Sequence, residues 1–239
     1  MNATFRASLT ALQRAQKTSK GAPAYSRLVN RPLGRLLAAG ANVIGLTPNQ
    51  VTSISALFTF GGIAVIALAE ASVLVSALAA SLLVIGYAFD AADGQLARLR
   101  GGGSVAGEWL DHVVDAIKIA CLHSSVLINW YRFEDASGRR LLVPIAFQAV
   151  ATIMFFVIIL NDQIRRAHRG TTQMLLEGDG SSSTWYSLAV VPTDYGVLCV
   201  VLGLMWWQGF IELYSVLLAA NAGFMVLALV KWFREMRRY

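Results

Sequence analysis

Residues 73–115 read VLVSALAASLLVIGYAFDAADGQLARLRGGGSVAGEWLDHVVD, and they join a long uncharged run to two groups of acidic residues. The run 73–89 has no charged residue and approaches the roughly 20 apolar residues that a membrane-spanning helix needs. Three glycines at 101–103 separate the acidic groups. Because glycine favours turns and lipid-exposed backbone must be helical, the stretch predicts two antiparallel helices whose carboxylates meet at one end.

The composition extends this prediction to the whole chain. Of 239 residues, 56% are hydrophobic and only 14% are charged, and the mean hydropathy is +0.56. These values are too apolar for an ordinary soluble domain. We therefore expect an all-α membrane protein, a bundle of about six transmembrane helices with an N-terminal amphipathic helix at the interface. The spans are predicted at residues 51–69, 72–98, 105–131, 140–164, 188–207 and 210–232.

The N-terminal part differs in character from the rest. We expect residues 1–47 to be a basic tail and juxtamembrane amphipathic helix, and residues 48–239 to be the transmembrane domain. For residues 24–39, arginines among leucines favour a helix lying on the bilayer. For residues 1–22, a similar helix and a basic tail that only sets topology both remain open. Residues 162–186 are polar and are expected to form a loop with a short helical start.

The basic residues predict the orientation in the membrane. Sixteen of the twenty Lys and Arg fall on one side of the predicted spans, in the segments that contain both termini. By the positive-inside rule, both termini and the acidic cluster face the cytoplasm, and we expect a bacterial cytoplasmic membrane. The net charge of +6 then reflects topology and contact with anionic membrane lipids, so no nucleic-acid partner is expected.

The acidic residues have helical spacing in both predicted helices. Charge inside a span is costly and usually marks a functional site. One side chain every three or four residues places each group on a single helical face. The two faces are Asp90, Asp93, Gly94 and Ala97, and Glu108, Asp111, His112 and Asp115.

Facing carboxylates repel unless cations neutralise them, which predicts a site for two Mg²⁺ or Mn²⁺ ions. Hydrated carboxylates at helix ends are the alternative. The small residues among them, Gly94, Ala97 and Gly107, either let the helices approach or leave room for a ligand.

The segment DAADGQLARLRGGGSVAGEWLDHVVD at 90–115 fits the pattern D-x2-D-G-x2-A-R-x8-G-x3-D-x3-D without departure. It resembles the signature of the CDP-alcohol phosphotransferase family, also called CDP-alcohol phosphatidyltransferases, the membrane enzymes of phospholipid synthesis. LTPNQVT at 46–52 is similar to the family's entry into its first span. The resemblance implies transfer of a substituted phosphate, with phosphatidyl as the expected group, from a CDP-linked alcohol such as CDP-diacylglycerol to an acceptor hydroxyl, with release of CMP. It also implies a homodimer.

The same resemblance assigns roles by position. The implied metal ligands are Asp90, Asp93, Asp111 and Asp115, and Asp115 is also the implied general base. The implied pocket for the cytidine diphosphate group contains Pro48, Thr52, Asp93, Gly94, Ala97, Arg98 and Gly107.

The base assignment has rivals. GEWLDHVVD at 107–115 also resembles the G-E-x-x-D-H stretch of the choline and ethanolamine branch, which adds Glu108 and His112 as catalytic candidates. A histidine that is only hydrogen-bonded between helices is the alternative for His112. Lys118 follows Asp115 by three residues and is expected to pair with it, either to neutralise it or to help bind the acceptor.

The acceptor itself is left open by the sequence. Arg165, Arg166 and Arg169 are candidates for binding a phosphorylated acceptor such as glycerol phosphate or inositol phosphate, although the positive-inside rule also explains them. Asp194, within PTDYG, could line the acceptor pocket or simply cap a helix.

Two other classes of protein use intramembrane carboxylates. Prenyltransferases carry two aspartate-rich motifs in well-separated parts of the chain, whereas here both groups lie within 26 residues. A cation transporter or channel would use the carboxylates as an ion site and needs a polar path through the bundle. Beyond Lys118 the predicted spans are nearly all apolar, which disfavours this alternative.

Overall fold

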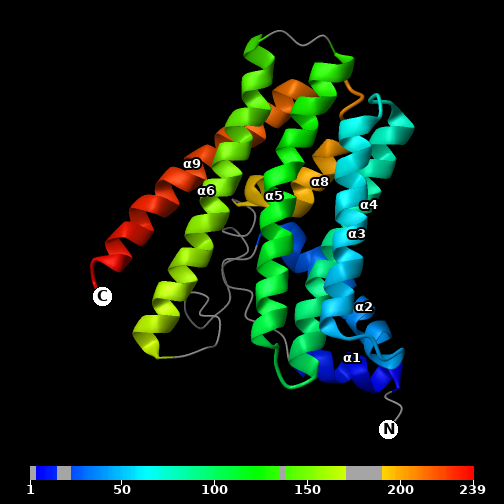
Figure 1. The fold of residues 1–239 in the computed structure, drawn as a ribbon, viewed down its shortest axis with the longest axis vertical. Helices are drawn as coiled ribbons and strands as arrows, with labels where there is room; N and C mark the ends of the chain where they lie inside the picture. Colours follow the sequence, from blue (N-terminus) through cyan, green and yellow to red (C-terminus); the bar gives the residue numbers. More distant parts are fainter. Residues whose placement is uncertain (1–3, 15–22, 135–137, 171–189) are drawn as a thin grey trace.

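The computed structural model describes residues 4–14, 23–134, 138–170 and 190–239 (Figure 1). All regular structure in these ranges is helical. The N-terminal elements are α1 (Phe5–Arg14), the π-helical η1 (Ser26–Asn30) and α2 (Arg31–Val43). The remaining elements are α3 (Pro48–Leu68), α4 (Val73–Leu99), α5 (Val105–Phe133), α6 (Gly138–Arg169), the short 3₁₀ turn η2 (Val191–Thr193), α8 (Tyr195–Leu202) and α9 (Phe210–Met236).

Five of the described helices are long and apolar enough to cross a membrane, namely α3, α4, α5, α6 and α9. This confirms the fold class and five of the predicted spans. The predicted span 188–207 is wrong as a single helix: α8 has eight residues, about 12 Å of rise, and residues 203–209 form turns. Its apolar composition suggested a span, but Pro192, Gly203 and Gly209 interrupt the helix. Residues 188 and 189 lie outside the described ranges.

The ends of the central helices follow from local sequence. Thr47 caps α3 in a capping box with Gln50, and Pro48 occupies the first turn, where its missing N–H costs nothing. Ser72 and Ser104 cap α4 and α5 through their side-chain oxygens. Between α4 and α5, Gly101 and Gly102 have φ values of 94° and 126°, a conformation that favours glycine. The predicted hairpin is therefore confirmed.

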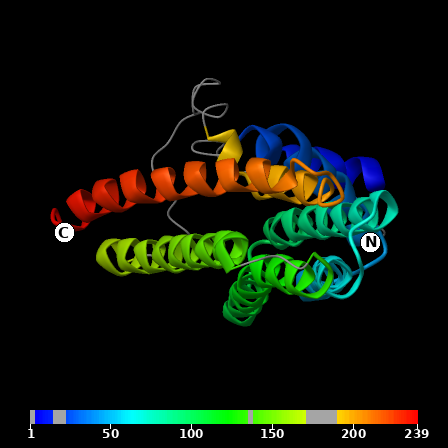
Figure 2. The ribbon, with the colours of Figure 1, turned by 90° about the horizontal axis from the view of Figure 1, so that it is seen from above.

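Helices α3 and α4 pack closely through small residues. Ser55 donates a hydrogen bond to the Gly86 carbonyl at 2.8 Å, and a Cβ on Gly86 would lie 2.2 Å from the Thr59 hydroxyl. This close contact between the two helices places α3 beside the acidic end of α4. Figure 2 shows α6 and α9 side by side, extending away from the other helices. In the most apolar 18-residue stretch of each helix, only 17% is buried within the chain. The outer faces of α6 and α9 are therefore available to lipid or to another subunit.

The N-terminal helices lie against the same end of the bundle. Leu12 of α1 is only 1% exposed, and Asn42 of α2 donates a hydrogen bond to the Ser8 hydroxyl at 2.9 Å. The expected helix within residues 24–39 is present as η1 and α2, and residues 5–14 are helical as well. Residues 15–22, and residues 171–186 of the expected polar loop, lie outside the described ranges.

Candidate active site

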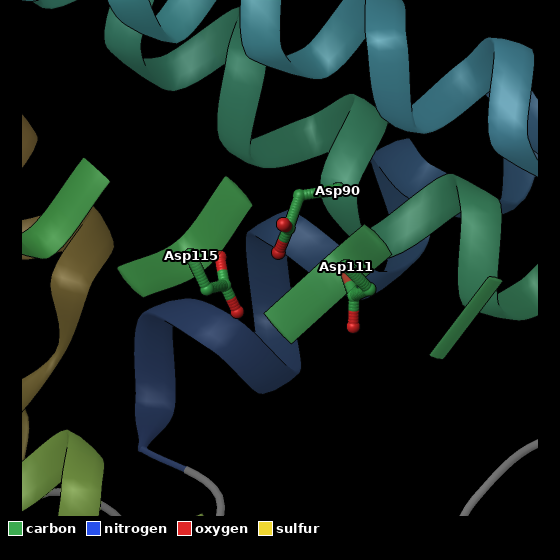
Figure 3. A group of neighbouring side chains, drawn as sticks. All are labelled: Asp90, Asp111 and Asp115. Carbon is green, nitrogen blue, oxygen red and sulfur yellow. The ribbon is translucent and has the colours of Figure 1, made fainter. Parts of the chain in front are cut away.

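Three aspartates from two helices form the centre of the site. Asp90 comes from α4, and Asp111 and Asp115 come from α5 (Figure 3). One carboxylate oxygen from each lies within 4.8 Å of the other two. Hard divalent cations prefer such oxygen donors, so the residues present fit the metal site that the sequence predicts.

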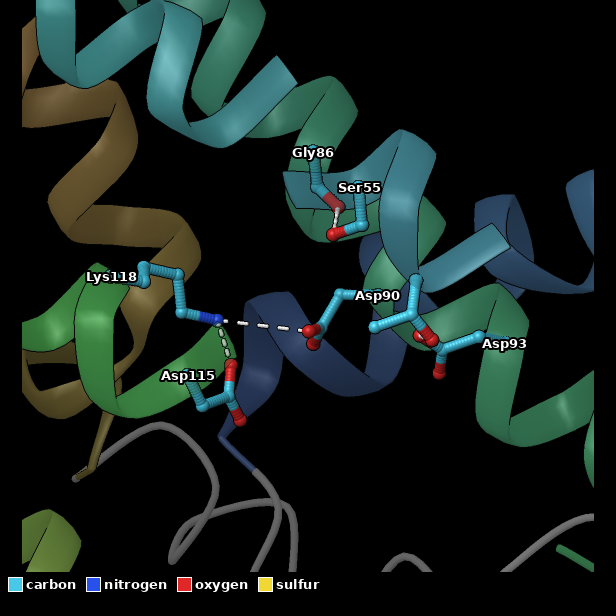
Figure 4. Close-up of polar contacts among 7 residues, drawn as sticks. Ser55, Gly86, Asp90, Asp93, Asp115 and Lys118 are labelled. Atoms are coloured by element: carbon cyan, nitrogen blue, oxygen red, sulfur yellow. Dashed lines mark hydrogen bonds and ion pairs between the residues drawn. The ribbon is translucent and has the colours of Figure 1, made fainter. Parts of the chain in front are cut away.

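A buried lysine lies beside this group. Lys118 is 8% exposed; its ammonium forms an ion pair with Asp115 and lies 3.7 Å from Asp90 Oδ1 (Figure 4). The ammonium also lies 5.0 Å from the centre of the Tyr195 ring, within the range of a cation–π contact. The pairing of Lys118 with Asp115 is as the spacing predicts. A metal ion and Lys118 would therefore compete for two of the same carboxylates.

The fourth predicted carboxylate has a different partner. Asp93 is 6% exposed and accepts a hydrogen bond from the Thr52 hydroxyl at 2.7 Å. This bond joins α4 to α3, and Asp93 is not part of the group of three (Figure 4). The structure thus brings three of the four aspartates together and directs the fourth toward Thr52, a residue that the family pattern places in the donor pocket.

The two candidate glycines have different surroundings. A Cβ on Gly107 would lie 2.9 Å from Asn49 Oδ1, so this glycine permits close packing of α5 on α3. A Cβ on Gly94 would meet only Arg98 Nη1, at 3.4 Å, which leaves space beside α4. Only Gly94 therefore borders room for a ligand.

The rival base candidates face α6. Glu108 Oε1 lies 2.7 Å from Arg166 Nη1 and 3.6 Å from His112 Nε2. Arg166 also pairs with Asp162 at 2.6 Å. Glu108 and His112 thus belong to an ion-pair network between α5 and α6, beside the carboxylate group on the same face of α5.

The other acceptor candidates are spread over three places. Arg165 forms two hydrogen bonds with Glu235 at 2.7 and 2.8 Å, which join α6 to α9. Arg169 is exposed at the end of α6. Asp194 caps α8 by accepting from the Gly196 N–H at 2.9 Å, and it also accepts from the Ser26 N–H at 2.8 Å.

A cavity adjoining Asp90 was not found by sequence reasoning. It has a volume of about 190 Å³ and lies between the N-terminal segment and α4. Its lining residues are Ser26, Asn30, Arg31, Tyr87, Asp90, Ala91, Gln95 and Arg98. The polar residues of YSRLVNR at 25–31 are the only local signal of the cavity, and their pattern by itself predicts part of an interfacial helix.

Comparison with known proteins places these features in a family. A sequence model of the CDP-alcohol phosphatidyltransferase family matches residues 45–231. No curated protein gives a significant sequence match. Among solved structures, the chain is similar to the Mycobacterium tuberculosis phosphatidylinositol phosphate synthase with CDP-DAG bound, at 19% identity and a TM-score of 0.56, covering 86% of this chain and 94% of that one. The same protein in complex with manganese and citrate matches at 20% identity and a TM-score of 0.55, covering 86% and 89%.

Proposed function

Because the chain belongs to the CDP-alcohol phosphatidyltransferase family, we propose that its three gathered aspartates are the catalytic centre of a phosphatidyl transfer from CDP-diacylglycerol to an acceptor hydroxyl. The enzyme class, a transferase of substituted phosphate groups in phospholipid synthesis, follows from the family. The observation that carries the assignment to residues is the group of Asp90, Asp111 and Asp115, whose oxygens lie within 4.8 Å of one another on the two helices that contain the family signature.

The proposed cofactor is Mg²⁺ or Mn²⁺, bound as two ions. The related Mycobacterium tuberculosis enzyme has been crystallised with manganese, and the oxygen donors here suit the same metals. When bound, the metal would neutralise the diphosphate and the departing CMP. Asp93 is proposed as a further ligand, with Thr52 fixing its orientation through the 2.7 Å hydrogen bond.

In the proposed reaction the acceptor oxygen bonds to the phosphorus that carries the lipid alcohol. The bond from that phosphorus to the CMP oxygen breaks, and the acceptor proton passes to a base. We assign the base role to Asp115, which lies in the carboxylate group and retains 24% side-chain exposure. Glu108 and His112 remain rival bases, although Glu108 is paired with Arg166. Pro48, Gly94, Ala97 and Arg98 stay assigned to the donor pocket, and Gly107 is proposed to shape it through the close packing of α5 on α3.

The acceptor-binding residues and the orientation of the chain in the membrane are also proposed. Arg165, Arg166, Arg169, Lys118 and Asp194 are the acceptor-binding candidates from sequence, and the ion pairs of Arg165 and Arg166 weigh against a primary role for those two. The chain is a multi-pass membrane protein; we propose that its active site and termini face the bacterial cytoplasm. We further propose a homodimer. The family match does not favour a cation transporter or channel.

The test is release of CMP by purified protein with Mn²⁺ or Mg²⁺, CDP-diacylglycerol and a panel of acceptor alcohols. We expect release with at least one acceptor and its loss in Asp115→Asn. Glu235→Gln is the matched control, because it neutralises a carboxylate that pairs with Arg165 outside the cluster. No CMP release with any acceptor, together with altered ion flux in Asp115→Asn, would contradict the proposal.

A further inference from the structure

Helix α9 ends in a basic segment that lies at the edge of the family-matched region. Residues 231–239, KWFREMRRY, contain four basic residues and one acidic residue, and the family match stops at residue 231. The basic residues are Lys231, Arg234, Arg237 and Arg238, and all four side chains are exposed. Three of them lie beyond the matched region, so the family match leaves their role open.

The single acidic residue of this segment is turned toward α6. Glu235 accepts hydrogen bonds from Arg165 at 2.7 and 2.8 Å and from the Tyr239 hydroxyl at 3.1 Å. Tyr239 also stacks on His168 of α6, with ring centroids 4.4 Å apart. These contacts hold the end of α9 against the end of α6. Because the Glu235 carboxylate is used there, the charges on the outward side of the segment are all basic.

The outward face of α9 changes from apolar to basic along its length. At about 100° per residue, positions 227, 231 and 234 form one row, and positions 226, 230 and 233 form the row beside it. Leu227 is 71% exposed, Val226 is 56% exposed and Phe233 is 67% exposed. Arg237 and Arg238 follow at the end of the helix. An exposed apolar strip therefore leads directly into the basic residues.

This arrangement matches the boundary of a phospholipid layer. Apolar side chains suit acyl chains, aromatic rings favour the interface, and basic side chains reach the phosphates of anionic headgroups. Leu227 precedes Arg234 by seven residues, a rise of about 10 Å, so one phospholipid molecule can contact both. The positive-inside rule would be satisfied by basic residues on any side of the helix. Their alignment with an exposed apolar strip is the feature that a bound lipid requires.

Two other occupants fit this face less well. A soluble acidic partner would neutralise the arginines but leave the apolar strip uncovered. A second copy of this chain, docked symmetrically through the same face, would bring two sets of four positive charges together, and such like-charge contacts are costly. Helices α6 and α9 also extend away from the other helices, which leaves this face open to the bilayer (Figures 1 and 2).

We propose that the outward face of α9 is a binding surface for an anionic phospholipid. Its phosphate lies among the four basic side chains, and an acyl chain lies along Val226, Leu227 and Val230. The surface goes beyond the proposed function, because none of its residues belongs to the carboxylate group or to the assigned donor pocket. Occupation by lipid anchors the projecting pair of α6 and α9 at the membrane surface.

The test measures lipid selectivity beside α9. Leu227→Trp places a reporter in the exposed apolar strip, and the protein is reconstituted into vesicles of phosphatidylcholine and phosphatidylglycerol in which one lipid at a time has brominated acyl chains. The quenching that this tryptophan adds over protein with Leu227 gives the relative binding of the two lipids. We expect a preference for phosphatidylglycerol. Arg234→Gln with Arg238→Gln should lower it about tenfold or more, since each basic residue near an anionic surface contributes roughly fivefold.

The controls separate this surface from the overall charge of the protein. Arg6→Gln with Arg14→Gln removes two exposed charges from α1 and should leave the preference unchanged. Arg234→Lys with Arg238→Lys should retain most of it, because the charges carry the interaction. Added NaCl should weaken the preference of the reporter protein, a measurement that does not depend on insertion of the glutamine variant.

Equal quenching by the two lipids, or a preference that survives Arg234→Gln with Arg238→Gln, would overturn the proposal. An equal loss in the α1 control would assign the preference to net charge and would overturn it as well. Absence of quenching by either brominated lipid would show that protein covers this face. Because CMP release enters none of these readouts, each such result leaves the proposed phosphatidyl transfer intact. A preserved lipid preference without any CMP release would reject the proposed function alone.

Discussion

The acidic residues on one face of helix α5 differ in what lies opposite them. Toward α4, Asp111 and Asp115 lie together with Asp90, and Lys118 pairs with Asp115 and Asp90. Toward α6, Glu108 is matched by Arg166 at 2.7 Å. A carboxylate matched by an arginine joins helices, whereas three carboxylates that share a small volume form a site for a cation. The comparison separates structural from functional charge within one helix.

Removing a carboxylate from the cluster and removing one that is paired with an arginine should have the most unequal effects. Asp111→Asn is expected to reduce kcat/KM about 10²–10³-fold and to weaken Mn²⁺ binding, because it removes a proposed ligand of the cation that would neutralise the reacting phosphate. Glu235→Gln, which weakens the pair with Arg165 and lies outside the cluster, should retain activity and lose about 1–3 kcal/mol of stability. Assays of CMP release and thermal unfolding measure both. Similar losses of kcat/KM in the two variants would contradict the distinction between catalytic carboxylates and carboxylates that only pair with arginines.

Substitution of Lys118 is expected to have an effect of intermediate size, and it tests what the ammonium does among the carboxylates. In Lys118→Met the carboxylates lose the ammonium that contacts Asp115 and Asp90, so their repulsion increases. We expect a lower Tm without metal and an Mn²⁺ affinity higher by about tenfold, because the ion no longer competes with the lysine. Titration with Mn²⁺ tests this. Unchanged or weaker metal binding would show that Lys118 supports the metal site instead of competing for it.

The smallest expected effect is on the pH dependence of stability, through Asp194, whose hydrogen bonds join η1 to α8. Burial raises the pKa of its carboxyl above the ordinary 3.8, although hydrogen bonds from Ser26 and Gly196 oppose the shift. The folded state therefore holds this proton more tightly than the unfolded state, and stability falls as the pH rises from near 3.8 through the raised pKa. Asp194→Asn keeps an acceptor oxygen for the cap but does not titrate. Its unfolding free energy should lack this decline, and a decline equal to that of the wild type would exclude Asp194 as the source.

The hairpin and the three clustered aspartates could be predicted because their signal is local. Charge at helical spacing inside an apolar run, followed by glycines, defines both the turn and the facing carboxylates. The partners of each side chain could not be predicted, because they come from distant parts of the chain. Asp93 bonds to Thr52, Arg166 pairs with Glu108, and the Arg31 carbonyl accepts from Gln95.

The fifth predicted span shows a second limit. Hydropathy measures whether a segment suits lipid, but it does not report whether the helix is continuous. Residues 191–209 are apolar enough to suggest a span, yet they form a short 3₁₀ turn, the eight-residue α8 and a series of turns. The cavity behind η1 was missed for a related reason, since an amphipathic pattern does not reveal which surface covers its polar face.

The proposed catalysis depends on a divalent metal held by Asp90, Asp111 and Asp115. The most direct measurement is anomalous diffraction at the manganese absorption edge from crystals of the protein grown with Mn²⁺. We predict an anomalous peak within coordination distance of carboxylate oxygens from all three aspartates, and no peak there in Asp111→Asn. A wild-type protein that shows no peak among these residues at saturating Mn²⁺, or that binds the ion elsewhere, would contradict the account.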